Sequence, residues 1–257
     1  MSYESLTQKI WRHPDCLLII FAGSSAEFAL SPRVDWLFYT GRLPGDPIER
    51  MFSTIAYSQR VLFADTCEKQ MQLTHQVQNI HAALEQKRGQ TLEPKDYRDV
   101  LLMTTAYTLK AYELVFGRAL TPTQSTDIIC EIAHAWRGMK LENTAEDYET
   151  FLDLRRDMFS RFVYSEWTPK LLQSYERILG QRGDLFLRLI YQELLDAEIL
   201  RLLSIQPSSV SWALKPFFFA SCHTGFIRIL YRLFFPSRLA AMFNQFDNLS
   251  RLPELTA

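Results

Sequence analysis

Apolar residues recur every three or four positions along most of the chain, which is the spacing of one face of an α-helix. Strand-like alternation is rare, and Pro, Gly and Asp punctuate the pattern where helices would begin or end. The pattern predicts an all-α protein with helices at 15–30, 47–65, 67–88, 95–117, 122–140, 145–164, 167–179, 184–204, 209–234 and 237–246. Two of these begin with an N-cap residue followed by proline, Asp46–Pro47 and Thr121–Pro122.

Length and composition indicate one large domain. A chain of 257 residues with 47% hydrophobic content can bury a sizeable core, and no internal repeat or low-complexity tract divides it. We therefore expect a single multi-helix domain over residues 1–257.

The charge balance argues against a nucleic-acid partner. Lys and Arg number 28 against 29 Asp and Glu, so the formal net charge is −1. Proteins that bind nucleic acid usually carry a basic surplus. We expect no such partner.

The four cysteines form no C-x-x-C pair, which argues against a zinc knuckle, a thioredoxin-like site or a disulfide framework. They are Cys16, Cys67, Cys130 and Cys222. The first residues are polar, and the apolar run 16–26 is too short to span a bilayer. These features favour a cytoplasmic protein.

The segment 212–235 is the most aromatic part of the chain, and two interpretations of it stay open. It could be a helix of the domain core whose arginines, Arg228 and Arg232, reach outward. It could instead make a peripheral contact with a membrane surface.

Familiar catalytic motifs do not account for the chain. It has no G-x-S-x-G elbow, H-E-x-x-H, P-loop or G-x-G-x-x-G sequence. "EIAH" gives one E-x-x-H motif, whereas a di-iron carboxylate site needs two, and Glu131 and His134 face away from the apolar side of their predicted helix. The small residues Ala22, Gly23 and Ala26 predict close helix packing.

His81 is the unusual histidine. At about 100° per residue it lies at the margin of an apolar face made by Leu73, Val77, Ile80 and Leu84, whereas His75 points the opposite way. An inward imidazole without a partner costs about 1–3 kcal/mol. It therefore needs a hydrogen bond to a neighbouring group, a metal or a cofactor.

The helix predicted at 47–65 has a polar side of uncommon composition. Arg50, Thr54, Tyr57 and Ser58 share it, while Met51, Ile55 and Leu62 lie on another side. By spacing alone this polar side would face solvent.

Three stretches together resemble a known family: "VDWLFYTGRLPGDPIERMFSTIAY", "VQNIHAALEQKRG" and "YRDVLLMTTAYTLKAYELVFGRALTPTQ". They are similar in order and character to the MpaB-type oxygenases and rubber oxygenases (latex clearing proteins), most clearly over residues 21–162. The resemblance implies an all-α domain that binds haem b through one histidine and uses dioxygen to cleave carbon–carbon double bonds in isoprenoid chains.

Matched to the family's motifs, the axial histidine falls on His81, and an Arg-x-x-x-Thr pair falls on Arg50 and Thr54. The resemblance implies that His81 binds the iron through Nε2, that Arg50 pairs with a haem propionate, and that Thr54 supplies a hydroxyl beside the cofactor, with a possible part in catalysis.

The chain departs from the rubber-cleaving members at two positions. Ser53 stands where they carry a lysine that can act as a second iron ligand, so the iron's sixth site should differ. For the glutamate that those members use as a base, Glu27 and Asp35 are the nearest candidates here.

The resemblance therefore leads us to expect an oxidoreductase: a haem b-dependent oxygenase with dioxygen and an apolar, isoprenoid or lipid-like substrate. A non-catalytic haem-binding or gas-sensing module is the alternative, followed by a haem-free helical interaction protein.

Overall fold

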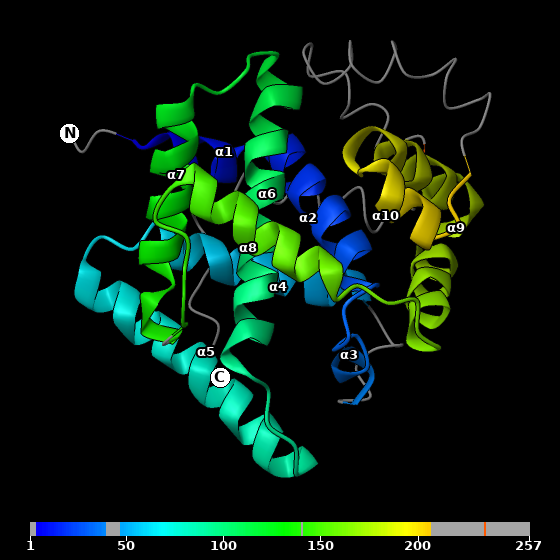
Figure 1. Ribbon diagram of the computed structural model, residues 1–257, viewed down its shortest axis with the longest axis horizontal. Coiled ribbons are helices and arrows are strands. Elements are labelled where there is room, and N and C mark those ends of the chain that lie inside the picture. The colour runs from blue at the N-terminus through cyan, green and yellow to red at the C-terminus, as the bar shows by residue number, and fades with distance from the viewer. Residues whose placement is uncertain (1–3, 40–46, 140, 207–233, 235–257) are drawn as a thin grey trace.

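The computed structural model describes residues 4–39, 47–139, 141–206 and 234, and within them it is all-α, as predicted (Figure 1). This part of the chain contains ten α-helices and one short 3-10 helix. They are α1 (Leu6–Arg12), α2 (Pro14–Phe28), α3 (Trp36–Tyr39), α4 (Pro47–Leu62), α5 (Cys67–Arg88), α6 (Pro94–Phe116), α7 (Pro122–Ala135), η1 (Arg137–Met139), α8 (Tyr148–Ser160), α9 (Trp167–Leu194) and α10 (Ala197–Leu202).

Helix α2 is the centre of the packing because its sequence is apolar on nearly every side. Most of its residues are buried, including the run 16–20, and a helix that is hydrophobic all round must be covered all round. It packs most extensively along α6 and also contacts α1 and α9. Figure 1 shows α2 and α6 together in the body of the molecule, with α8 crossing α6.

Helix ends follow local sequence signals. The Thr66 side chain accepts a hydrogen bond from the Lys69 backbone N–H at the start of α5 (3.1 Å), and Thr121 caps α7 in the same way. Gly89 and Gly117 end α5 and α6 with φ of 67° and 63°. That left-handed conformation favours glycine because it has no Cβ.

The predicted boundaries of α5 are confirmed, and those of α2, α4 and α6 differ by at most a few residues. The short helices α1 and α3 were not predicted, because four to seven residues give too little periodicity. The predicted break after residue 179 is confirmed as a kink at the non-helical Gly180 within α9, whereas the helix predicted at 184–204 is divided, because α9 ends at Leu194 and α10 follows. Asp46 and the helices predicted at 209–234 and 237–246 lie outside the described residues, apart from 234.

The described part of the predicted aromatic segment 212–235 is a single residue, Phe234. Its ring stacks on that of Phe186 in α9, with the ring centroids 5.1 Å apart and the planes inclined by 22°. Phe234 packs against the hydrophobic core. In the part of the chain that the structure describes, every helix is too short or too polar to cross a bilayer.

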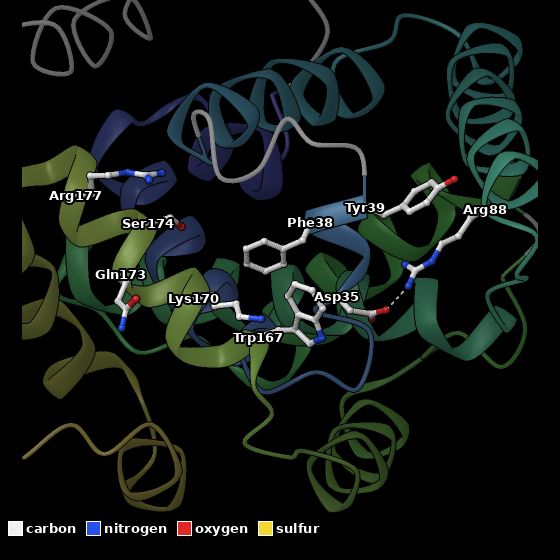
Figure 2. Close-up of a pocket in the computed structure, with 9 residues that line it drawn as sticks. All are labelled: Asp35, Phe38, Tyr39, Arg88, Trp167, Lys170, Gln173, Ser174 and Arg177. Carbon is white, nitrogen blue, oxygen red and sulfur yellow. Dashed lines mark hydrogen bonds and ion pairs between the residues drawn. The ribbon is translucent and has the colours of Figure 1, made fainter.

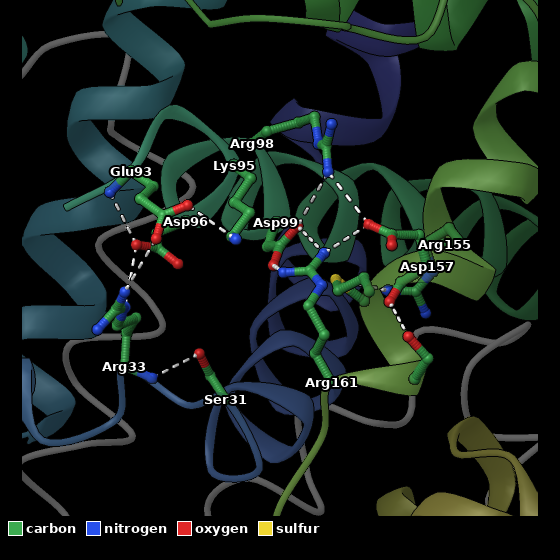
Figure 3. A network of polar contacts seen from close by, with 12 residues as sticks. Ser31, Arg33, Glu93, Lys95, Asp96, Arg98, Asp99, Arg155, Asp157 and Arg161 are labelled. Atoms are coloured by element: carbon green, nitrogen blue, oxygen red, sulfur yellow. Dashed lines mark hydrogen bonds and ion pairs between the residues drawn. The ribbon is translucent and has the colours of Figure 1, made fainter.

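An ion-pair network joins α6 to the end of α8 (Figure 3). The Arg161 guanidinium donates to both carboxylate oxygens of Asp99, at 2.7 and 3.1 Å, and to Asp157 at 2.9 Å. Arg98 approaches the same two carboxylates, at 3.8 and 3.4 Å. Burial raises the pKa of Asp99, and the positive charges of Arg161 and Arg98 oppose that shift. The network fixes the position of α8 across α6.

The predicted close packing at Ala22, Gly23 and Ala26 is confirmed, and Gly23 is its tightest point. All three are buried, and a Cβ added at Gly23 would lie 2.1 Å from a ring carbon of Tyr107 in α6. The Tyr107 side chain is fully buried and has no room to move away. The α2–α6 contact therefore depends on glycine at this position.

We expect Gly23→Ala to lower the free energy of unfolding by about 1–3 kcal/mol, the usual cost of overpacking a core. Urea denaturation measures the loss. Ser24→Ala on the same helix is the control, because the Ser24 hydroxyl is buried without a hydrogen-bond partner among the described residues and its removal should cost little. Equal stability of Gly23→Ala and the parent would contradict the close approach.

Candidate functional site

Helices α4 and α5 present the residues that the sequence singled out. They follow one another in the chain and pack together. The Tyr57 hydroxyl of α4 donates to the Leu73 carbonyl of α5 (2.7 Å), and the Gln70 amide of α5 donates to the Val61 carbonyl (3.1 Å). Part of the polar side of α4 therefore faces α5, not solvent. These bonds fix how Arg50 and Thr54 lie relative to His81.

The His81 imidazole is half-buried on α5. Its ring meets the edge of Tyr97 at the start of α6, with ring centroids 5.0 Å apart, and no hydrogen bond joins it to another of the described residues. Burial lowers the pKa of His81, the positive charge of Arg50 lowers it further, and the negative charge of Glu85 opposes both. A neutral imidazole with unengaged nitrogens is the form that binds a metal.

The positive charge of Arg50 acts on residues of two other helices, α5 and α9. Its charge acts on His81 and also on Tyr175 of α9. Burial raises the pKa of Tyr175 to about 12, and a hydrogen bond with Ser25 and the charge of Arg50 oppose the shift. The charge of Arg50 on α4 therefore reaches His81 on α5.

Thr54 is one turn beyond Arg50 and is exposed. Its hydroxyl donates to the Arg50 carbonyl (2.9 Å), and the hydroxyl of Ser53 donates to the same carbonyl (2.8 Å). Both side chains are therefore bonded to their own helix.

The predicted apolar face of α5 is partly wrong. Leu73 is buried and Val77 and Leu84 are half-buried, but Ile80 is 57% exposed. The helix extends beyond the body of the protein over its second half (Figure 1), so the face that the periodicity marks as apolar has less to pack against there. His81 itself remains on the covered side, facing Tyr97.

Glu27 lies in the core, at the end of α2. It is fully buried, and Arg155 of α8 donates to both of its oxygens, at 2.5 and 2.6 Å, while the Tyr107 hydroxyl donates at 2.6 Å. Burial and the Glu27 charge raise the pKa of Tyr107 well above its ordinary value. The carboxylate is thus held in a bidentate pair, the geometry for which guanidinium is suited.

Asp35, the other candidate base, lies at a cavity of about 680 Å³ bounded by α3, the end of α5 and α9 (Figure 2). It pairs with Arg88, whose guanidinium lies over the rings of Trp36 and Tyr39 at 4.4 and 5.1 Å. The Tyr39 hydroxyl donates to the Lys87 carbonyl (2.8 Å). The cavity is lined by Asp35, Phe38, Tyr39, Arg88, Trp167, Lys170, Gln173, Ser174 and Arg177.

The α9 residues of this cavity were not identified from the sequence. Trp167, Lys170, Ser174 and Arg177 are spaced by three, four and three positions, so they share one helix face. This mixed aromatic and basic stripe was the available signal. Their proximity to Asp35, however, depends on the long-range packing of α3 against α9.

The chain was compared with protein families, curated proteins and solved structures. The family described as "ER-bound oxygenase mpaB/B'/Rubber oxygenase, catalytic domain" matches residues 18–243. The chain belongs to this mpaB/rubber oxygenase family. No curated protein and no solved structure matches it.

Membership in the mpaB/rubber oxygenase family extends the resemblance seen at 21–162 to nearly the whole chain. It makes this an oxygenase-type domain, whose partners at the coarse level are dioxygen and a small molecule. Two of the other histidines, His75 and His134, are exposed, as predicted. His223 is outside the described residues.

Glu27→Gln should lower the free energy of unfolding by about 3–5 kcal/mol, because it leaves the buried Arg155 charge unpaired. Glu27→Gln/Arg155→Met should recover part of the loss, since neither charge then remains in the core. Urea denaturation of the two variants and of Arg155→Met completes the cycle. Additive effects, or a stable single variant, would contradict a structural ion pair.

Arg50→Gln should raise the pKa of His81, and Arg50→Lys should leave it low because the charge is kept. NMR titration of the imidazole measures both. The folded-state pKa is below its ordinary value of 6.5, so the unfolded chain binds this proton more tightly.

Above pH 6.5, where His81 is neutral in both states, its titration should cost no folding stability. As the pH falls below 6.5, the free energy of unfolding should decrease until His81 is protonated in the folded state as well. His81→Gln should flatten this part of the stability profile. A pKa of His81 that is the same in the parent and in Arg50→Gln would show that Arg50 does not act on it.

Proposed function

We propose that this chain is a haem b-dependent oxygenase that uses dioxygen on an apolar, extended small molecule, with His81 as the residue that would hold the iron. The observation that carries the proposal is the half-buried His81 imidazole, without a hydrogen bond to the described residues and beside the charge of Arg50. Family membership supports the oxygenase class.

The residues around His81 fit a haem. The described residues contain no group of three or more His, Cys, Asp and Glu side chains that could hold a metal ion by themselves. A single imidazole holds iron when a porphyrin supplies the other ligands. Arg50 provides a cation for a propionate, and the Tyr97 ring lies beside the imidazole.

The haem would supply the dioxygen chemistry, and the protein would supply ligation, orientation and exclusion of water. His81 would bind the iron through Nε2. Arg50 would hold one propionate, with Thr54 adding a hydroxyl one turn away. Ser53 cannot replace the lysine of the rubber-cleaving members, because its short side chain bonds the Arg50 carbonyl.

Of the two candidate bases, Asp35 has the better position. It lines the cavity of about 680 Å³, a size typical of small-molecule sites. Glu27 is buried behind Arg155 and Tyr107 and would stabilise the frame. We therefore propose Asp35 as the carboxylate nearest the substrate.

His81→Ala should remove the Soret absorbance of the reconstituted protein, as isolated and after dithionite. His75→Ala and His134→Ala are matched controls on exposed positions and should retain it. Arg50→Ala should retain a Soret band but lose haem faster to an apo acceptor. A full Soret band in His81→Ala would reject the ligand assignment.

Reduced protein under air should consume oxygen with apolar, extended substrates. Prenylated quinones, polyisoprene oligomers and unsaturated fatty acids are the compounds to offer, with carbonyl products identified by mass spectrometry. Turnover confined to small polar molecules would contradict the proposed substrate class. An intact Soret band without turnover on any compound would favour the haem-binding or gas-sensing module.

A further inference from the structure

The cavity between α3 and α9 has an aromatic wall. The rings of Phe38 and Trp167 lie 5.0 Å apart at 35°, and Tyr39 continues the wall toward α5. Figure 2 shows Phe38 and Trp167 between Arg88 on one side and the α9 side chains on the other. Such a wall suits a hydrocarbon chain or an unsaturated group.

The charged lining of the cavity is mainly basic. Arg88, Lys170 and Arg177 line it together with one carboxylate, Asp35, which pairs with Arg88. The Lys170 ammonium lies 4.0 Å from the Trp167 ring centroid and 3.0 Å from Glu166, which is exposed. Two basic side chains of α9 therefore border the aromatic wall.

Arg88 also has an unsatisfied donor. Its Nη1 is buried and makes no hydrogen bond to any of the described residues, although Nη2 pairs with Asp35. A buried donor without an acceptor costs about 1–3 kcal/mol. Arg88 therefore closes the α5 end of the cavity with a cation that Asp35 satisfies only in part.

We propose that this cavity binds an amphiphilic molecule with an anionic head group, a carboxylate or a phosphate. The head is held by the basic side chains of Lys170 and Arg177, and the apolar part lies along Phe38, Tyr39 and Trp167. As a binding site the inference stands on the cavity itself. As the class of the substrate it rests on the proposed oxygenase function.

The site would recognise the head group of the ligand by its charge and the hydrocarbon part of the ligand by its apolar surface. Exposed cations contribute modestly one at a time, but two that border the same aromatic wall favour an acid over the corresponding alcohol. A neutral hydrocarbon would gain the apolar contact alone. Binding of the acid should accordingly weaken as salt is raised.

Farnesoic acid, farnesyl phosphate and farnesol test the proposal because they share one isoprenoid chain. Isothermal titration calorimetry on the full chain, haem-free and haem-loaded, should give tighter binding of one or both anions than of farnesol. Lys170→Met/Arg177→Gln should weaken anion binding roughly tenfold, the lower range for a hydrogen bond to a charged group, and leave farnesol within about twofold.

Arg182→Gln is the matched control, since it removes an exposed charge from the same helix outside the cavity. It should leave binding of all three compounds unchanged. The relative affinity of the acid and the phosphate identifies which head group the site prefers.

Equal affinity for farnesol and both anions would overturn the proposal. So would a loss of anion binding in Arg182→Gln equal to that in Lys170→Met/Arg177→Gln. A Soret band in the same samples would leave the haem assignment standing in either case. Lower haem affinity in Lys170→Met/Arg177→Gln with unchanged anion binding would also overturn it, by assigning the basic residues to the propionates. Anion binding in a chain that takes up no haem would keep this inference and reject the proposed function.

Discussion

The buried ion pair between Glu27 and Arg155 is the constraint on which the arrangement of helices depends. It joins α2 to α8 across 128 positions of sequence, and Tyr107 adds α6 through the same carboxylate. An isolated charge in this position would be strongly unfavourable, so the three groups must be placed together or not at all. The same requirement makes Gly23 necessary, because only glycine lets the Tyr107 ring lie against α2.

Outside this frame, the candidate site residues are less covered. His81 and Asp35 are half-buried and Thr54 is exposed, in contrast to the closed packing around α2. The α4–α5 hydrogen bonds and the stacking of Arg88 on Trp36 and Tyr39 fix the positions of these residues without burying them fully. A site that admits a ligand needs both properties, a fixed set of side chains and space between them.

The positions of the two candidate carboxylates separate their roles. Glu27 and Asp35 are eight residues apart, and in the sequence they were equivalent candidates for a base. In the structure each is paired with an arginine, but Glu27 faces the core and Asp35 faces the cavity. Burial and partner, not residue type, therefore decide which could meet a substrate.

The sequence by itself determined the features whose causes lie within a few residues. The all-α class, the limits of α5 between Thr66 and Gly89, and the capping of α7 by Thr121 follow from periodicity and local hydrogen bonds. The matching of Arg50 and His81 came from motif order, and their proximity followed because α4 and α5 are neighbours in the chain.

Only the tertiary structure decided which groups from distant segments meet. Periodicity marked Ile80 as apolar, but its exposure depends on whether another helix covers that turn of α5. Glu27 and its partner Arg155 are 128 positions apart in the sequence. In the cavity formed by α3, α5 and α9, Asp35 and Arg88 are 53 positions apart. Such contacts arise from the packing of whole helices, and no local pattern encodes them.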